Sequence, residues 1–167
     1  QSYHIIAVAQ HKMKDYKSAL ECEEKALEIR LKLFGENHAD SAQSYNSVGV
    51  TQQVMKDYKS ALESKEKALE IRLKLFGENH ADTAQSYHNI GVTQHEMKDY
   101  QSALECDKKA LEIRLKLFGE NHPDTAQSYD NIGVTQHAMK DWKSALECKE
   151  KALEIRLKLF GENHADT

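Results

Sequence analysis

The chain has 167 residues and a formal net charge of −4, from 23 basic and 27 acidic residues that are interspersed along it. This pattern excludes the clustered lysine and arginine that nucleic-acid binding requires. No apolar run approaches the ~20 residues of a membrane-spanning helix, so we expect no membrane partner. No signal peptide is visible, and we expect a cytoplasmic, intracellular protein.

The sequence repeats itself at a fixed interval. Four phenylalanines lie 42 residues apart and each precedes Gly-Glu-Asn-His: Phe34, Phe76, Phe118 and Phe160. A period of this length is typical of stacked copies of one supersecondary unit. We predict one array over 1–167, with repeats at about 1–38, 39–80, 81–122 and 123–164, and with 165–167 as the start of an absent fifth repeat.

Each complete repeat reads as two helices. The chain opens with residues 1–12, the remainder of a first helix that lacks its opening turn. The third copy predicts a first helix over 81–96, a turn at 97–98 and a second helix from 100 to about 117, and the last second helix is predicted over 142–159. Asp99 is placed to cap a helix start, and Gly119 to end a helix. Pro123 opens the first helix of the fourth copy, where proline is favoured.

The second helix has two apolar stripes rather than one. The first stripe contains Leu104, Leu111, Leu115 and Phe118, and the other contains Ala103, Cys106, Ala110, Ile113 and Leu117. A helix with neighbours on two sides needs two stripes. The pattern therefore predicts an all-α fold: an α-solenoid of four helix-turn-helix repeats, with about eight antiparallel helices.

The three cysteines share one position of the repeat: Cys22, Cys106 and Cys148. Equivalent residues of neighbouring copies are expected to lie beyond the ~7 Å Cα separation that a disulfide allows. We predict small buried thiols, with no zinc or redox chemistry.

One histidine precedes each first helix: His38, His80, His122 and His164. Copies of one residue lie along an array and cannot converge on a single ion, so we predict a capping or interhelical hydrogen bond and no metal site. The chain has no glycine-rich phosphate loop, no Gly-x-Ser-x-Gly and no clustered carboxylate pair. We therefore expect no catalytic residues, no cofactor and no enzyme.

The repeat resembles the tetratricopeptide repeat. The third copy has Tyr87-x2-Ile90-Gly91, followed by Tyr100, Ala103 and Ala110 at matching spacing. The stretch from Ala110 to Ala126 is similar to the long repeat of kinesin light chains. The resemblance implies a right-handed superhelix in which Gly91 and Ala103 allow the paired helices to approach closely.

The sequence departs from the family pattern at several positions, among them Gln94, which replaces the second aromatic residue, and the end of the second helix, which lacks the usual proline. Asp107 stands where a buried aromatic residue is usual. A lysine replaces the turn glycine, so four lysines are predicted in the left-handed region at a cost of ~1 kcal/mol each: Lys14, Lys56, Lys98 and Lys140.

The four copies differ mainly on one face of the first helix. In the family that is resembled, first helices line the concave surface that binds ligands. Carried over by position, the predicted partner-binding groove contains His4, Val8, Lys12, Asn46, Val50, Val54, Gln85, His88, Asn89, Val92, His95, Glu96, Asp130, Asn131, Val134 and His137. Neutral drift on an exposed face is the alternative, and variation on the second helix at Glu23, Lys65, Asp107 and Lys149 favours drift.

The leading hypothesis is a protein–protein interaction scaffold that binds a partner peptide or helix in this groove. The alternative is a structural or consensus-engineered solenoid without a dedicated ligand, because the copies are nearly identical. The last helix repeats the interior stripes without a capping helix, so weak head-to-tail self-association with another copy is also predicted.

Overall fold

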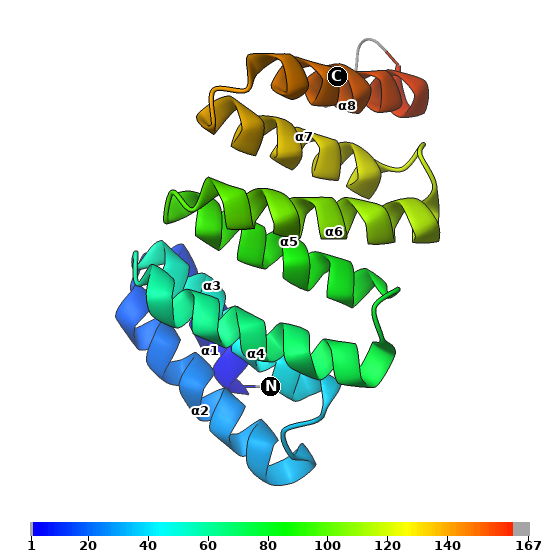
Figure 1. Ribbon diagram of the computed structural model, residues 1–167. Coiled ribbons are helices and arrows are strands. Elements are labelled where there is room, and N and C mark those ends of the chain that lie inside the picture. The colour runs from blue at the N-terminus through cyan, green and yellow to red at the C-terminus, as the bar shows by residue number, and fades with distance from the viewer. Residues whose placement is uncertain (1, 162–167) are drawn as a thin grey trace. The chain divides into compact units, whose positions relative to one another are not determined.

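The computed structural model describes residues 2–161, except for the side chains of residues 4 and 160. This part of the chain holds helices and no strand, which confirms the prediction of an all-α solenoid of repeats. The helices are α1 Ser2–Lys12, α2 Tyr16–Phe34, α3 Ala39–Val54, α4 Tyr58–Phe76, α5 Ala81–Glu96, α6 Tyr100–Phe118, α7 Pro123–Ala138 and α8 Trp142–Phe160 (Figure 1). The predicted start of a fifth repeat at 165–167, with His164, lies outside the described residues.

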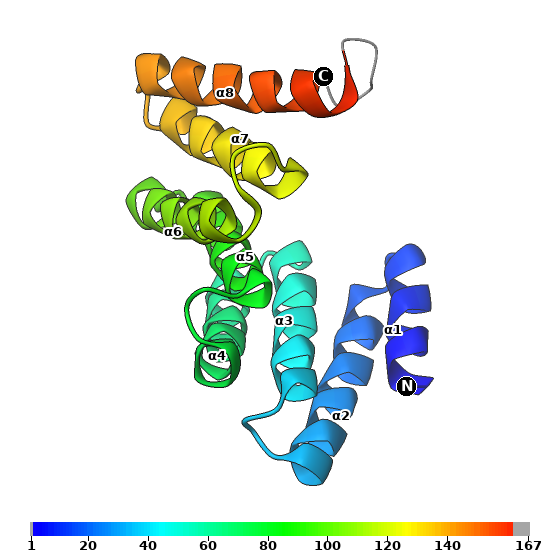
Figure 2. The ribbon, with the colours of Figure 1, turned by 90° about the vertical axis from the view of Figure 1, so that its right-hand side faces the viewer.

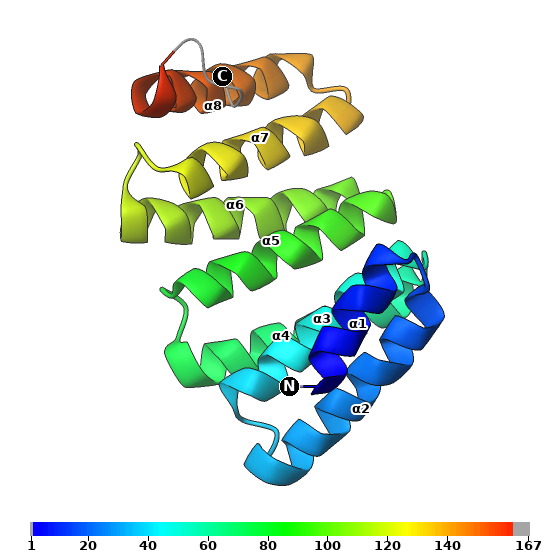
Figure 3. The ribbon, with the colours of Figure 1, turned by 180° about the vertical axis from the view of Figure 1, so that it is seen from behind.

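The helices form two compact units that divide after Gly77. In the first unit, α1 pairs with α2 and α3 with α4, and α3 also packs against α2 (Figure 2). In the second unit, α5 pairs with α6 and α7 with α8, and α7 packs against α6 (Figure 3). Within each unit, therefore, a first helix covers the second helix of the preceding repeat.

Side-chain caps set the starts of the helices. Before each second helix an aspartate Oδ1 accepts a hydrogen bond from a backbone N–H three residues on, as Asp99 does from Ser102 at 3.3 Å. Before α3, α5 and α7 a histidine Nδ1 accepts a hydrogen bond from a backbone N–H two residues on. The Asp82 N–H, for example, donates to His80 Nδ1 at 3.1 Å. The capping role predicted for the histidines is thus confirmed for His38, His80 and His122, and Pro123 holds the first position of α7.

Positive backbone angles end the helices and make the turns. The glycine after each second helix has φ between 78° and 81°, and its N–H donates to a leucine carbonyl of the last turn. The four turn lysines have φ between 61° and 65°, so the predicted left-handed conformation is confirmed. The second helices run to Phe118 and Phe160, one residue beyond the predictions, because the glycine itself ends them.

Small residues dominate the core. Ala103 and Ala110 are almost fully buried, and Leu104 is 9% exposed under α7. The stripes are less buried at the ends of the described chain: Ile29 is 43% exposed and Leu146 60% exposed.

The prediction of buried cysteines is wrong. All three thiols are only half-buried: Cys22, Cys106 and Cys148. Their position lies beside the fully buried alanine row rather than within it. Partial burial still raises the pKa of the Cys148 thiol.

Candidate functional site

The predicted groove residues of the second unit meet where α5 lies beside α7. Asn131 Nδ2 donates a hydrogen bond to His88 Nδ1 at 2.7 Å, which joins the two first helices directly. Gln85 Nε2 donates to Asn89 Oδ1 at 2.9 Å along α5. The structure therefore brings His88, Asn89 and Asn131 into one polar surface, which we call the α5/α7 groove.

Asp107 lies beneath this groove. The side chain comes from α6 and is only 4% exposed. Its Oδ2 accepts a hydrogen bond from Thr135 Oγ1 at 3.1 Å, and its Oδ1 lies beside Gly91. A Cβ at residue 91 would come within 2.9 Å of that oxygen, so glycine makes room for the carboxyl group. Burial raises the pKa of Asp107 to about 6, against the opposing effects of the Thr135 hydrogen bond and the Arg114 charge.

A hollow of about 240 Å³ opens above Asp107. Its walls come from α5, α6 and α7, and its lining consists of Gly91, Val92, His95, Glu96, Asp107, Asn131, Val134 and Thr135. Five of these were predicted as groove residues: Val92, His95, Glu96, Asn131 and Val134. Among the described residues, His95 Nε2 is buried without a hydrogen-bond partner.

In the first unit, other charged residues occupy the position equivalent to Asp107. There Thr51 Oγ1 donates to Glu23 Oε2 at 2.5 Å, and His11 Nε2 lies 3.6 Å from Glu23 Oε1. In the next repeat Lys65 is 2% exposed and donates to Gln53, and burial lowers its pKa to about 8. The variation at this position is therefore not drift on an exposed face, because Glu23, Lys65 and Asp107 are all buried.

In the fourth repeat the corresponding residue is paired. Lys149 Nζ lies 2.9 Å from Asp130 Oδ1, and Arg156 binds the other carboxylate oxygen. Asp130, a predicted groove residue, is thus held by two cations of α8. Its charge is already compensated within the repeat.

Sequence reasoning missed two sets of residues around the site. An arginine of each second helix reaches across to a first helix: Arg114 Nη1 donates to Ser128 Oγ at 2.8 Å and Nη2 donates to Gln85 Oε1 at 3.2 Å. A buried threonine of a first helix faces the variable acid in two places, since Thr51 donates to Glu23 and Thr135 to Asp107. The arginine is identical in all four copies and the threonine in three, and we interpreted such identity as framework.

The remaining predicted groove residues do not join the α5/α7 groove. Val8, Val50 and Val54 are exposed in the first unit, as is Lys12, while Asn46 is half-buried. The side chain of His4 lies outside the described residues. His137 stacks edge-on against Trp142 at 4.7 Å in a separate hollow that it shares with Val134.

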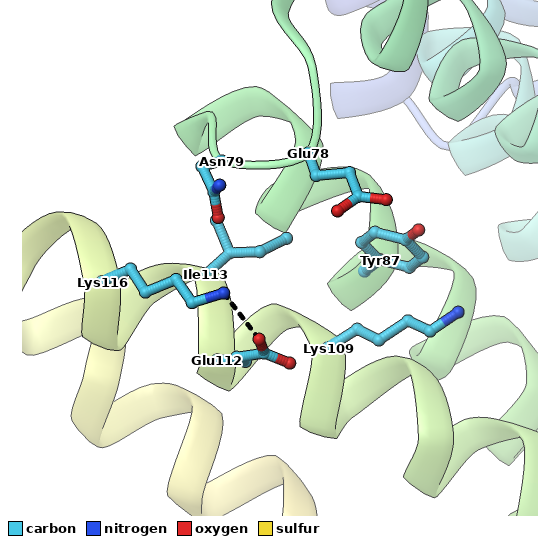
Figure 4. Close-up of a pocket in the computed structure, with 7 residues that line it drawn as sticks. All are labelled: Glu78, Asn79, Tyr87, Lys109, Glu112, Ile113 and Lys116. Carbon is cyan, nitrogen blue, oxygen red and sulfur yellow. Dashed lines mark hydrogen bonds and ion pairs between the residues drawn. The ribbon is translucent and has the colours of Figure 1, made fainter.

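Another hollow lies between α5, α6 and the loop before α5 (Figure 4). Lys109 Nζ lies 5.2 Å from the centre of the Tyr87 ring, and Lys116 pairs with Glu112 at 2.7 Å. The same seven residue types line the equivalent hollow 42 residues on, at Glu120, Asn121, Tyr129, Lys151, Glu154, Ile155 and Lys158. Because this hollow does not vary between copies, we interpret it as part of the framework.

Among residues 2–161 no group of three or more histidine, cysteine, aspartate or glutamate side chains is arranged to hold a metal ion. None of the helices in the described part of the chain combines the length and apolarity that a membrane crossing needs.

The tetratricopeptide repeat model matches residues 1–72, 46–116 and 95–158, so that the matches extend over nearly the whole sequence. The chain belongs to the tetratricopeptide repeat family. The resemblance drawn from Tyr87, Gly91 and Ala103 is thereby confirmed. Proteins built from tetratricopeptide repeats generally act as scaffolds for protein interactions. Comparison with curated proteins finds no match.

Solved structures show the same fold. BtubC from P. vanneervenii is 27% identical with a TM-score of 0.88, and the match covers 97% of this chain and 65% of that one. A putative kinesin light chain from Podosopora anserina with nearly identical TPR-like repeats is 21% identical with a TM-score of 0.86, over 99% of this chain and 78% of that one. The apo form of RapI is 23% identical with a TM-score of 0.80, over 94% of this chain and 55% of that one.

Proposed function

We propose that this chain is a protein–protein interaction module that binds an extended segment or a helix of a partner protein along its first helices. The observation that carries the proposal is the α5/α7 groove, where residues that differ between copies converge on a fixed framework. His88 and Asn131 are joined across the groove by a hydrogen bond of 2.7 Å. The equivalents of His88 are His4, Asn46 and Asp130, so the polar group at this position differs between neighbouring repeats.

Buried charges at one position of the second helices support this proposal. Partly desolvated titratable groups such as Asp107 and Lys65 cost stability, and such groups gather at functional sites. A purely structural solenoid gains nothing from them, since an apolar residue at the same position would pack without that cost.

Charge substitution in the groove tests the proposal. The double variant Asn89→Lys/Asn131→Lys is expected to lose capture of partners that the parent retains from a lysate, with its helical circular dichroism unchanged. Gln101→Lys is a matched control, because it adds lysine at an exposed position where the other copies already have it, at Lys17, Lys59 and Lys143. Retention of the same partners by the double variant would refute groove binding.

Self-association is a second candidate role, and one observation favours it. Leu104 is 9% exposed beneath α7, whereas its equivalent on α8, Leu146, is 60% exposed. The occupant we propose is α1 of a second copy, which is homologous to α7 and exposes Ile5 at 67% and Ile6 at 45%. Such a head-to-tail contact is heterologous and does not close, and the entropy of association keeps it weak.

A further inference from the structure

The hollow above Asp107 has the size of a side-chain subsite. Its volume of about 240 Å³ falls below the ~300–1,000 Å³ of typical small-molecule sites. It opens on the α5/α7 groove through Val92 and Asn131, which are half-buried. A side chain of a segment lying in the groove can therefore enter it. We call it the Asp107 pocket.

The floor of the Asp107 pocket is an incompletely compensated carboxyl group. Within the described residues, Thr135 is the only hydrogen-bond donor to Asp107, and it binds Oδ2 rather than Oδ1. Arg114 attracts the carboxylate only at a distance, since its guanidinium donates to Ser128, to Gln85 and to a backbone carbonyl. A buried carboxylate in this state favours a cation beside its remaining oxygen.

The walls of the Asp107 pocket can accommodate the aliphatic part of a long basic side chain. Val92 and Val134 line the pocket from opposite helices, α5 and α7, and provide apolar surface for methylene groups. Lysine and arginine bury their aliphatic stems in this way while the charged head reaches polar groups. Glu96 adds a second carboxylate at an exposed position of the lining, and His95 Nε2 is buried there without a partner among the described residues.

We propose that the Asp107 pocket receives a lysine or arginine side chain of the partner segment. The inference rests on the proposed function, because it names the chemistry that the groove selects at this repeat. The cationic head pairs with Asp107 Oδ1 and Glu96, and the stem lies between the two valines. The equivalent position of the second repeat excludes a cation, because Lys65 occupies it and is buried. The basic side chain is thus specified at the third repeat and not at the second.

The test uses short glycine–alanine host peptides, blocked at both ends, that carry one arginine, one citrulline or one glutamate. Citrulline keeps the shape of arginine without its charge. Amide resonances of Gly91 and Val134 report binding to the full chain. The arginine peptide is expected to shift these resonances with an affinity about tenfold higher than that of the citrulline peptide. The variant Asp107→Asn is expected to remove that preference.

Glu112→Gln is the matched control. It removes the same charge from α6 at an exposed position outside the Asp107 pocket, so it is expected to keep the preference for arginine. Equal shifts from all three peptides, or a preference that survives Asp107→Asn, would overturn the basic subsite while leaving groove binding intact. The absence of shifts from every peptide also overturns the subsite. Groove binding itself is judged separately, by partner capture with the Asn89 and Asn131 variants.

Discussion

Replacement of Asp107 by asparagine is expected to stabilise the protein at neutral pH, although it removes a charged group from a hydrogen bond. Burial raises the pKa of this carboxyl from 3.8 to about 6 in the folded chain. Below pH 3.8 the carboxyl is protonated in both the folded and unfolded states and adds no pH-dependent term. Between the two values the folded state binds more protons, so the free energy of unfolding falls as pH rises.

The size of the effect follows from the shift. About two pKa units at ~1.36 kcal/mol each give a loss of about 3 kcal/mol, complete above pH 6. Asparagine has nearly the same shape, can accept the hydrogen bond from Thr135 and carries no charge at either pH. The variant is therefore expected to gain up to about 3 kcal/mol over the parent at neutral pH relative to acid pH.

Urea unfolding of parent and variant at about pH 4 and about pH 7.5 measures the difference. The exposed control Glu112→Gln is expected to change in the opposite direction, because Lys116 lowers the pKa of Glu112 and so favours its charged form in the folded chain. That contribution is present above pH 4.5 and is lost as pH falls. If the difference between Asp107→Asn and the parent is the same at both pH values, the desolvation argument is wrong.

Three further results are expected from packing, capping and exposed ends. Leu104→Ala is expected to lower the free energy of unfolding by roughly 2–5 kcal/mol, whereas Leu146→Ala changes it by only about 0.5 kcal/mol; equal losses would contradict the difference in burial. His80→Ala removes the Nδ1 acceptor at the start of α5 and is expected to cost about 1 kcal/mol in thermal unfolding, and an unchanged midpoint would contradict the cap. Sedimentation over a wide concentration range is expected to show concentration-dependent association that Leu146→Glu abolishes, and a strict monomer throughout would refute head-to-tail stacking.

Local chemistry explains why the helices could be predicted closely. Asp99, His80 and Gly119 act on backbone groups within a few residues of themselves, so their effect is visible in a short stretch of sequence. The 42-residue period then carries each such prediction to the other copies. The extension to Phe118 shows the limit of this reading, since the position of a helix end depends on which residue first adopts a positive φ.

The site was predicted less completely, because the burial of its residues depends on packing between repeats. Asp107 varies among copies like an exposed residue, yet α7 buries it against Gly91 and Thr135. The sequence contains no local sign of this contact, which joins residues 28 positions apart. The cysteines show the opposite error, since they were predicted to be buried and are only half-buried.

The position of Asp107 allows each repeat to carry its own charge. One residue of each second helix differs in charge while the surrounding framework stays the same: Glu23, Lys65 and Asp107 are buried, and Lys149 is exposed. Because the repeats share their caps, turns and buried alanines, exchanging whole repeats rearranges these charged residues without disturbing the fold within a repeat. Duplication and recombination of repeats can therefore produce new arrangements of charged residues from units that already fold.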